Sequence, residues 1–118
     1  MALTILVAKD NLVEGVDICD TCEEAGYLVE GPHDGLCDAM LALQKGRPDL
    51  AILDLQLKDG AIYEFARKLR DENVPIIFQS IAAREDDLAA AFPGSANLAA
   101  PCPPARFIDA INRMLVPV

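Results

Sequence analysis

The sequence is poor in positive charge, in histidine and in long apolar runs. It carries 10 Lys and Arg residues against 19 Asp and Glu residues, for a net charge of −9, and it has one histidine and no tryptophan. This balance argues against direct nucleic-acid binding, which needs a basic surface, and against binding to an anionic membrane. No apolar run approaches the roughly 18 residues of a membrane span. The start, Met1 to Thr4, lacks the basic residues of a signal peptide, so we expect a cytoplasmic protein.

The cysteines are too few and too scattered to indicate a disulfide framework. Cys19 and Cys22 form a C-x-x-C pair, and with Cys37 and His33 they raise the alternative of a zinc–thiolate or redox site. That pair falls inside a helical pattern, however, and the sequence has no second C-x-x-C. We therefore expect Cys19, Cys22, Cys37 and Cys102 to be reduced thiols, buried or half-buried.

The chain of 118 residues, 53% of them hydrophobic, suits one domain over residues 1–118 with a single core. Short apolar strands alternate with helical patterns along it. The strands are expected at 4–8, 27–30, 50–53, 74–78 and 97–100, and the helices at 12–25, 36–45, 62–69, 88–92 and 107–115. This alternation predicts an α/β fold: a five-stranded parallel sheet, doubly wound and flavodoxin-like, with strand order 2-1-3-4-5. The sequence has neither G-x-G-x-x-G after the first strand nor a P-loop motif, which excludes those two nucleotide sites.

Two aspartates stand where buried strands end. Asp54 follows Ala51-Ile52-Leu53, and Asp10 follows the strand 4–8 and Lys9. The carboxyl ends of neighbouring parallel strands open onto one crevice, where ligands bind. Two carboxylates there suit a hard divalent cation, and Asp54 could act as a nucleophile that forms an acyl phosphate. Asp10 could instead cap the first helix.

In the order and spacing of its motifs, the chain resembles the receiver domain of response regulators from two-component systems. The similarity covers nearly the whole chain. It rests on the following segments: Ile5 to Asn11, Gly26-Tyr27, Asp34-Gly35, Pro48 to Asp54, Val74 to Ile77, and Pro101.

The resemblance implies a role for each matching residue. Asp54 falls on the phosphoacceptor aspartate and Asp10 on an acid that binds Mg²⁺, while Gln56 would offer its backbone carbonyl to the same ion. Ser80 falls on the residue whose hydroxyl meets the phosphoryl group, although it could equally be a solvated loop hydroxyl. The implied partners are a histidine kinase or phosphotransfer protein and a downstream protein. Phosphoryl transfer needs mainly positioning and cations from the protein, so the chain is not expected to be an enzyme.

The sequence also departs from the family pattern. Lys9 replaces the first acid of the family's acidic pair, and Ala100 replaces the usual lysine before the proline. Asn97 replaces the aromatic switch residue. Lys58 stands where the family has a proline after the phosphoacceptor, and Ile62 stands where it has a glycine at the start of the third helix. The missing lysine removes a charge that contacts the phosphoryl group. We hypothesise that Lys9 partly replaces that charge by reaching Asp54, which would weaken Mg²⁺ binding or pair the site permanently.

Two functions follow from these residues. The first is a stand-alone receiver, phosphorylated on Asp54 by a histidine kinase with Mg²⁺. The alternative is a pseudo-receiver, a protein-interaction module without phosphate-driven switching, which Lys9, Asn97 and Ala100 favour. An apolar surface near the end of the chain suits a protein partner or a homodimer, although such residues are more often core; it comprises Ala89, Ala90, Ala91, Phe92, Pro103, Pro104 and Phe107.

Overall fold

The computed structural model describes residues 3–80, 91–92, 94–99 and 102–115, and its strands and helices alternate along the chain. In chain order the elements are β1 (Thr4–Ala8), α1 (Leu12–Glu24), β2 (Leu28–His33), α2 (Leu36–Lys45), β3 (Leu50–Asp54), β4 (Gln56–Leu57), β5 (Gly60–Ala61), α3 (Tyr63–Asp71), β6 (Ile76–Ser80), β7 (Ala96–Ala99) and α5 (Pro104–Leu115). None of the helices in these ranges is both long and apolar enough to cross a membrane.

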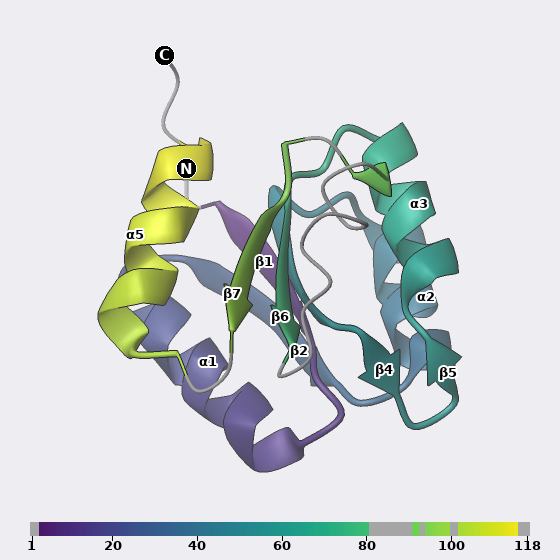
Figure 1. The fold of residues 1–118 in the computed structure, drawn as a ribbon, viewed down its shortest axis with the longest axis horizontal. Helices are drawn as coiled ribbons and strands as arrows, with labels where there is room; N and C mark the ends of the chain where they lie inside the picture. Colours follow the sequence, from purple (N-terminus) through teal and green to yellow (C-terminus); the bar gives the residue numbers. More distant parts are fainter. Residues whose placement is uncertain (1–2, 81–90, 93, 100–101, 116–118) are drawn as a thin grey trace.

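The main sheet is five-stranded, with the order β2-β1-β3-β6-β7 (Figure 1). Every neighbouring pair in it is parallel. Numbering only the strands of this sheet in chain order gives 2-1-3-4-5, which confirms the predicted fold and order. Residues Ile5 to Ala8 and Leu50 to Leu53 are at most 1% exposed, as expected for central strands covered on both faces.

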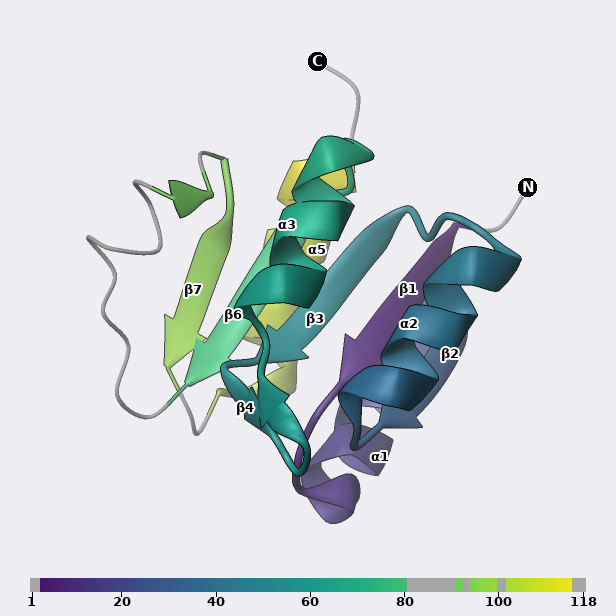
Figure 2. The same ribbon diagram turned by 90° about the vertical axis from the view of Figure 1, so that its right-hand side faces the viewer.

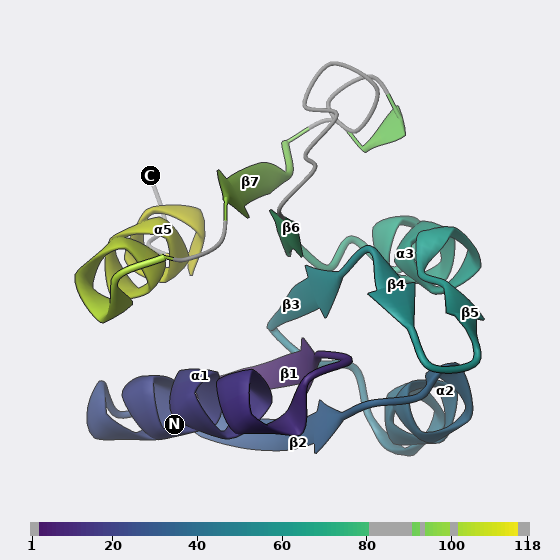
Figure 3. The same ribbon diagram turned by 60° about the horizontal axis from the view of Figure 1, so that its bottom comes forward.

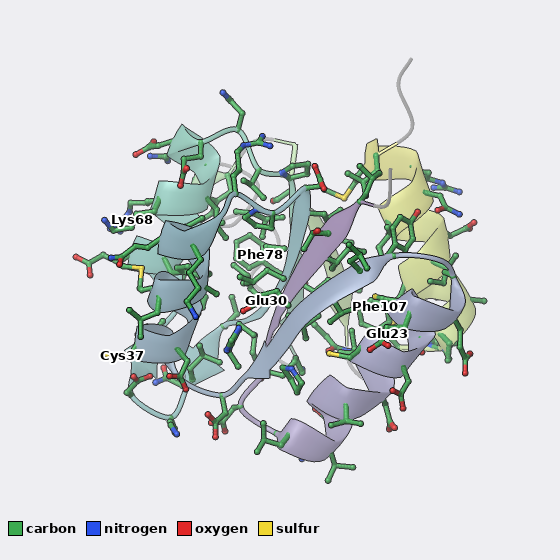
Figure 4. The ribbon with its side chains drawn as sticks, turned by 180° about the vertical axis from the view of Figure 1, so that it is seen from behind. Glu23, Glu30, Cys37, Lys68, Phe78 and Phe107 are labelled. Atoms are coloured by element: carbon green, nitrogen blue, oxygen red, sulfur yellow. The ribbon has the colours of Figure 1, made fainter. Side chains whose placement is uncertain are left out.

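Helices cover both faces of the sheet. Figure 3 shows α1 and α5 on one face and α2 and α3 on the other. Each face has its own cluster of buried apolar side chains. Phe78 of β6 belongs to the cluster under α2 and α3, and Phe107 belongs to the one under α1 and α5, so the two rings lie on opposite sides of the sheet (Figure 4). The central strands are therefore buried between two layers of helices.

The structure differs from the sequence prediction after β1 and after β3. The second strand, expected at 27–30, continues through His33, and the β1–β2 register shifts between Leu6 and Ala8. Gly31 makes this path possible, since its φ is 128°. Residues 56–61, which lie between the expected strand at 50–53 and the expected helix at 62–69, form a small antiparallel hairpin in which Gln56 pairs with Ala61.

Part of the predicted partner surface is core. Phe92 and Phe107 are each only 3% exposed, so neither ring is available on the surface. Pro103 and Pro104 are exposed. The rest of the predicted fourth helix, including Ala89 and Ala90, lies outside the described residues, as do Ala100 and Pro101. A homodimer through this surface stays a prediction.

Candidate functional site

The predicted site lies at the carboxyl edge of the main sheet. In Figure 2 the arrowheads of β1, β3, β6 and β7 all point to the same edge, where the β4–β5 hairpin also lies. Ala8 of β1 pairs with Leu53 of β3, and Asp54 pairs with Gln79 of β6. Parallel pairing therefore brings the residues after β1, the end of β3 and the end of β6 together, as the sequence predicted for Asp54 and the β1 terminus.

Asp54 is half-buried, with 23% of its side chain exposed. Its Oδ1 accepts a hydrogen bond from the backbone N–H of Leu55 at 3.1 Å, and its Oδ2 accepts a longer one from the N–H of Asp10 at 3.4 Å. These contacts orient the carboxylate while leaving part of it open to solvent. A carboxylate held in this way can act as a nucleophile towards a group that arrives from solution.

Lys9 is buried beside Asp54, although lysine side chains rarely are. The residue is 2% exposed, and its Nζ lies 3.6 Å from Oδ2 of Asp54 and 3.5 Å from Oε2 of Glu14. The hypothesis that Lys9 reaches Asp54 is confirmed in its geometry. The pairing offsets the cost of burying a charge, which would otherwise be several kcal/mol. The sequence held no signal for the contact between Glu14 and Lys9.

Gly15 lets α1 pack closely against Pro32 of β2, next to Lys9. A Cβ at Gly15 would lie 2.7 Å from Cβ of Pro32, which is closer than Cβ atoms approach in real proteins, whereas its distance of 3.4 Å to Cβ of Lys9 would be an ordinary contact. A larger residue at position 15 would therefore push α1 away from β2.

Asp10 is exposed and does not cap the first helix. The cap is Asn11, whose Oδ1 accepts the N–H groups of Val13 at 2.9 Å and of Glu14 at 3.2 Å. The alternative role of Asp10 as an N-cap is therefore wrong, because the extended backbone at Asn11 places the next residue in the capping position. Asp10 contacts Asp54 through its backbone N–H, and its role as a metal ligand stays a prediction.

Gln56 and Ser80 lie at the same edge. Gln56 opens the β4–β5 hairpin, and its side-chain Nε2 donates to the carbonyl of Leu57 at 3.2 Å. Ser80 is the last residue of β6 and pairs with Ala99 of β7, one position beyond the Asp54–Gln79 pair. The backbone of Ser80 therefore lies at the same edge of the sheet as Asp54. Its role towards a phosphoryl group, and that of the Gln56 carbonyl towards a metal, stay predictions.

The described residues fit directly bound Mg²⁺ poorly. The carboxylate of Asp54, which would hold such an ion, already faces the Lys9 ammonium, at 3.6 Å from Oδ2. Near a protein surface, like unit charges about 4 Å apart repel by about 4 kcal/mol, and a divalent ion doubles that repulsion. Within the described ranges, no cluster of three or more His, Cys, Asp or Glu side chains could hold a metal ion. We therefore derive no step of the chemistry from a bound metal.

Hydrogen bonds and an ion pair connect the β4–β5 hairpin after Asp54 to the start of α2 and the residues before it. Asp59 accepts the backbone N–H groups of Leu36 at 2.7 Å and Cys37 at 3.4 Å, and so caps the start of α2. Lys58 forms an ion pair with Asp34 at 3.1 Å. The hydrogen bond from Leu36 lowers the pKa of Asp59, and the bond to Asp34 raises the pKa of Lys58. Nothing in the sequence indicated this long-range cap.

The cysteines do not come together into a metal or redox site. Cys19 and Cys22 are buried in α1, while the exposed Cys37 lies on α2, across the sheet (Figure 4). Burial raises the pKa of the Cys19 thiol to about 11 and that of Cys22 to about 12. These two thiols are therefore mostly protonated and unreactive near neutral pH, which supports the expectation of reduced, buried cysteines for Cys19 and Cys22. The expectation of burial is wrong for Cys37, whose position on α2 leaves it exposed.

Comparison with known proteins places this geometry in one family of folds. No protein-family model matches the chain. The polar-differentiation response regulator DivK of Brucella anthropi is 26% identical over 121 residues, covering 98% of both chains. A response regulator receiver protein from Sinorhizobium medicae is 26% identical, with a TM-score of 0.82 over 97% of this chain and 94% of that one.

The chemotaxis response regulator CheY4 of Vibrio cholerae shares the fold, with a TM-score of 0.84 over 98% of this chain and 100% of that one, at 24% identity. All three proteins are response regulators or receivers, and the similarity runs from end to end. The parallel sheet and the aspartate at the end of its central strand agree with this relationship. The chain therefore resembles response-regulator receiver domains over its whole length, and in it Lys9 stands beside the central aspartate.

Proposed function

We propose that this chain is the phosphoacceptor module of a two-component system and that Asp54 receives a phosphoryl group from a histidine kinase or phosphotransfer protein. In this proposal the chain is a signalling switch that acts on a downstream protein, and it is not an enzyme with a separate substrate. It works in the cytoplasm, and its net charge of −9 disfavours a nucleic-acid partner.

The observation that supports the proposal most strongly is the position of Asp54. It is the last residue of the central strand β3, at the edge where a parallel sheet binds ligands. Its side chain is 23% exposed, so a donor can reach it, and a lysine ammonium lies 3.6 Å from one of its oxygens. A nucleophilic carboxylate beside a fixed positive charge suits the transfer of an anionic phosphoryl group.

The test is phosphorylation by phosphoramidate, a small donor whose P–N bond resembles that of a phosphohistidine. We expect intact-mass spectrometry to detect one added phosphoryl group on the wild type and none on Asp54→Asn. Asp71→Asn is the matched control, because Asp71 is an exposed aspartate on α3. An unmodified wild type, or an Asp54→Asn variant modified as fully as the wild type, would overturn the proposal.

One observation favours the alternative of a pseudo-receiver. The Lys9–Asp54 ion pair already neutralises the carboxylate, so a phosphoryl group would bring a smaller change than in an unpaired site. The experiment that separates the two functions is a backbone amide NMR titration with beryllofluoride, an acyl-phosphate mimic. Shifts that spread from residues 10, 54 and 80 to β7 support the switch. Shifts confined to the site, or none, support the interaction module.

A further inference from the structure

Three polar side chains stand in one row across the carboxyl edge of the main sheet. Asp54 of β3 pairs with Gln79 of β6, and Lys9 follows Ala8, which pairs with Leu53. Lys9 therefore continues the row on the other side of Asp54. We call these three residues the edge row. Asp54 lies in its middle, between an ammonium and an amide.

The edge row faces the helices α1 and α5. Ile52 and Ile77, two residues before Asp54 and Gln79, belong to the core cluster that these helices cover. Side chains two positions apart on a strand share a face, so Asp54 and Gln79 point to the same side, which is also the side of Glu14 on α1 (Figure 3). The edge row therefore lies on the face of the sheet that α1 and α5 cover, at the carboxyl edge of that face.

The ammonium of Lys9 is held by two long ion pairs. Its distances of 3.5 Å to Glu14 and 3.6 Å to Asp54 both exceed the usual N–H···O hydrogen-bond range of about 2.7–3.2 Å. An ammonium has three donors, and these two ion pairs hold it in place without close hydrogen bonds. A buried positive charge of this kind is suited to an incoming oxyanion.

Gln79 is the second observation that indicates a ligand. It is only 5% exposed, and its buried Oε1 has no hydrogen-bond partner. Buried polar groups without partners are rare because each costs free energy. Turning the amide about its terminal torsion exchanges Oε1 for the Nε2 donor group. The side chain can then donate to an oxyanion that lies between it and Lys9, on Asp54.

We propose that Lys9 and Gln79 bind the oxygens of a phosphoryl group on Asp54, so that the site is phosphorylated without a divalent metal ion. Lys9 is the resident cation, and Gln79 is a positioning residue. This inference rests on the proposed function, because it concerns the same phosphoacceptor. With an acyl-phosphate donor, a carboxylate oxygen of Asp54 forms a bond to phosphorus, the bond from phosphorus to the donor oxygen breaks, and the donor leaves as a carboxylate with that electron pair.

The experiment measures phosphorylation by acetyl phosphate in excess EDTA and in excess Mg²⁺, by intact mass. We expect the wild type to be modified at similar rates in both. Lys9→Met should react about a hundredfold more slowly in EDTA, the usual effect of removing one preorganised charge or donor. Lys9→Arg should restore most of the rate, and Gln79→Leu should lower it. Lys68→Met, at an exposed lysine of α3, is the control for loss of charge and should match the wild type.

The outcomes separate this inference from the proposed function. A wild type modified only with Mg²⁺ overturns the inference and leaves Asp54 as the phosphoacceptor. A wild type that is modified under neither condition overturns both. If Lys9→Met does not fold, the inference is tested instead by an amide NMR titration of the wild type with beryllofluoride in excess EDTA. Amide shifts at residues 9, 54 and 79 support the metal-independent site, and their absence overturns it.

Discussion

The Nζ atom of Lys9 lies 3.6 Å from Oδ2 of Asp54, and only 3% of the lysine side chain is exposed. The pair joins the ends of the two central strands, β1 and β3. A receiver site usually collects negative charge at this point, whereas here the second charge is positive. The properties of the site should therefore depend on residue 9 more than on any other neighbour of Asp54.

The first prediction concerns magnesium. Replacing Lys9 by aspartate removes the competing ammonium and adds a carboxylate, so Lys9→Asp should bind Mg²⁺ at least about tenfold more tightly than the wild type, by calorimetric titration. Lys68→Asp makes the same change of charge at an exposed position and should leave the affinity nearly unchanged. Equal affinities for the wild type and Lys9→Asp would show that the lysine does not control access to the metal.

The second prediction concerns Gly15. An alanine there would put its Cβ 2.7 Å from Cβ of Pro32. Overpacking of this kind costs about 1–3 kcal/mol, against a gain of about 1 kcal/mol in helix propensity, so Gly15→Ala should lower the free energy of unfolding in urea. Gly46→Ala is the control, because a Cβ at Gly46 meets no atom within 4 Å. A Gly15→Ala variant as stable as Gly46→Ala would show that α1 shifts freely.

The third prediction concerns the hairpin and pH. The hydrogen bonds that Asp59 accepts, above all the one from Leu36, lower its pKa below the ordinary value of an aspartate, so its ionised form stabilises the folded state. That contribution is complete above the unfolded pKa and is lost as the pH falls through the lower, folded pKa. Asp59→Ala should therefore lower the melting temperature at pH 7, and the difference from the wild type should shrink below about pH 4. Asp59→Asn keeps an oxygen acceptor and should fall between them, whereas a difference independent of pH would argue against an ionised cap.

The fourth prediction concerns the thiols. Cys37 is exposed, Cys102 is partly buried, and Cys19 and Cys22 are buried with pKa values raised to about 11 and 12. The thiolate is the reactive form. At pH 8 iodoacetamide should therefore modify Cys37 first, Cys102 more slowly, and Cys19 and Cys22 only after unfolding in urea, as followed by peptide mass spectrometry. Modification of Cys19 in the folded protein would indicate that α1 opens.

The sequence predicted the sheet well, because its central strands are short, apolar and buried on both faces. The same pattern placed Asp54 at a strand end and led to the hypothesis of a contact with Lys9, since the ends of adjacent parallel strands must meet. Both inferences use only the period of the apolar residues and the rules of parallel topology.

Other features could not be predicted because they depend on contacts between distant residues. The two-residue strands at 56–57 and 60–61 are too short to show a period. The cap that Asp59 gives to Leu36 joins positions 23 residues apart. Gln79 was the missed signal: a polar residue at the end of an apolar strand, directly after Phe78, marks a buried amide that needs a partner.

The position of Lys9 has one more consequence for how the site responds to its surroundings. A dissolved ion occupies a pocket in proportion to its concentration, so its effect varies with the supply of that ion. The Lys9 ammonium is part of the chain, so there is always one per molecule. Glu14 of α1 forms an ion pair with it. The positive charge beside Asp54 is therefore constant under chelation and ion depletion, and the chain has its local counter-charge as soon as it folds.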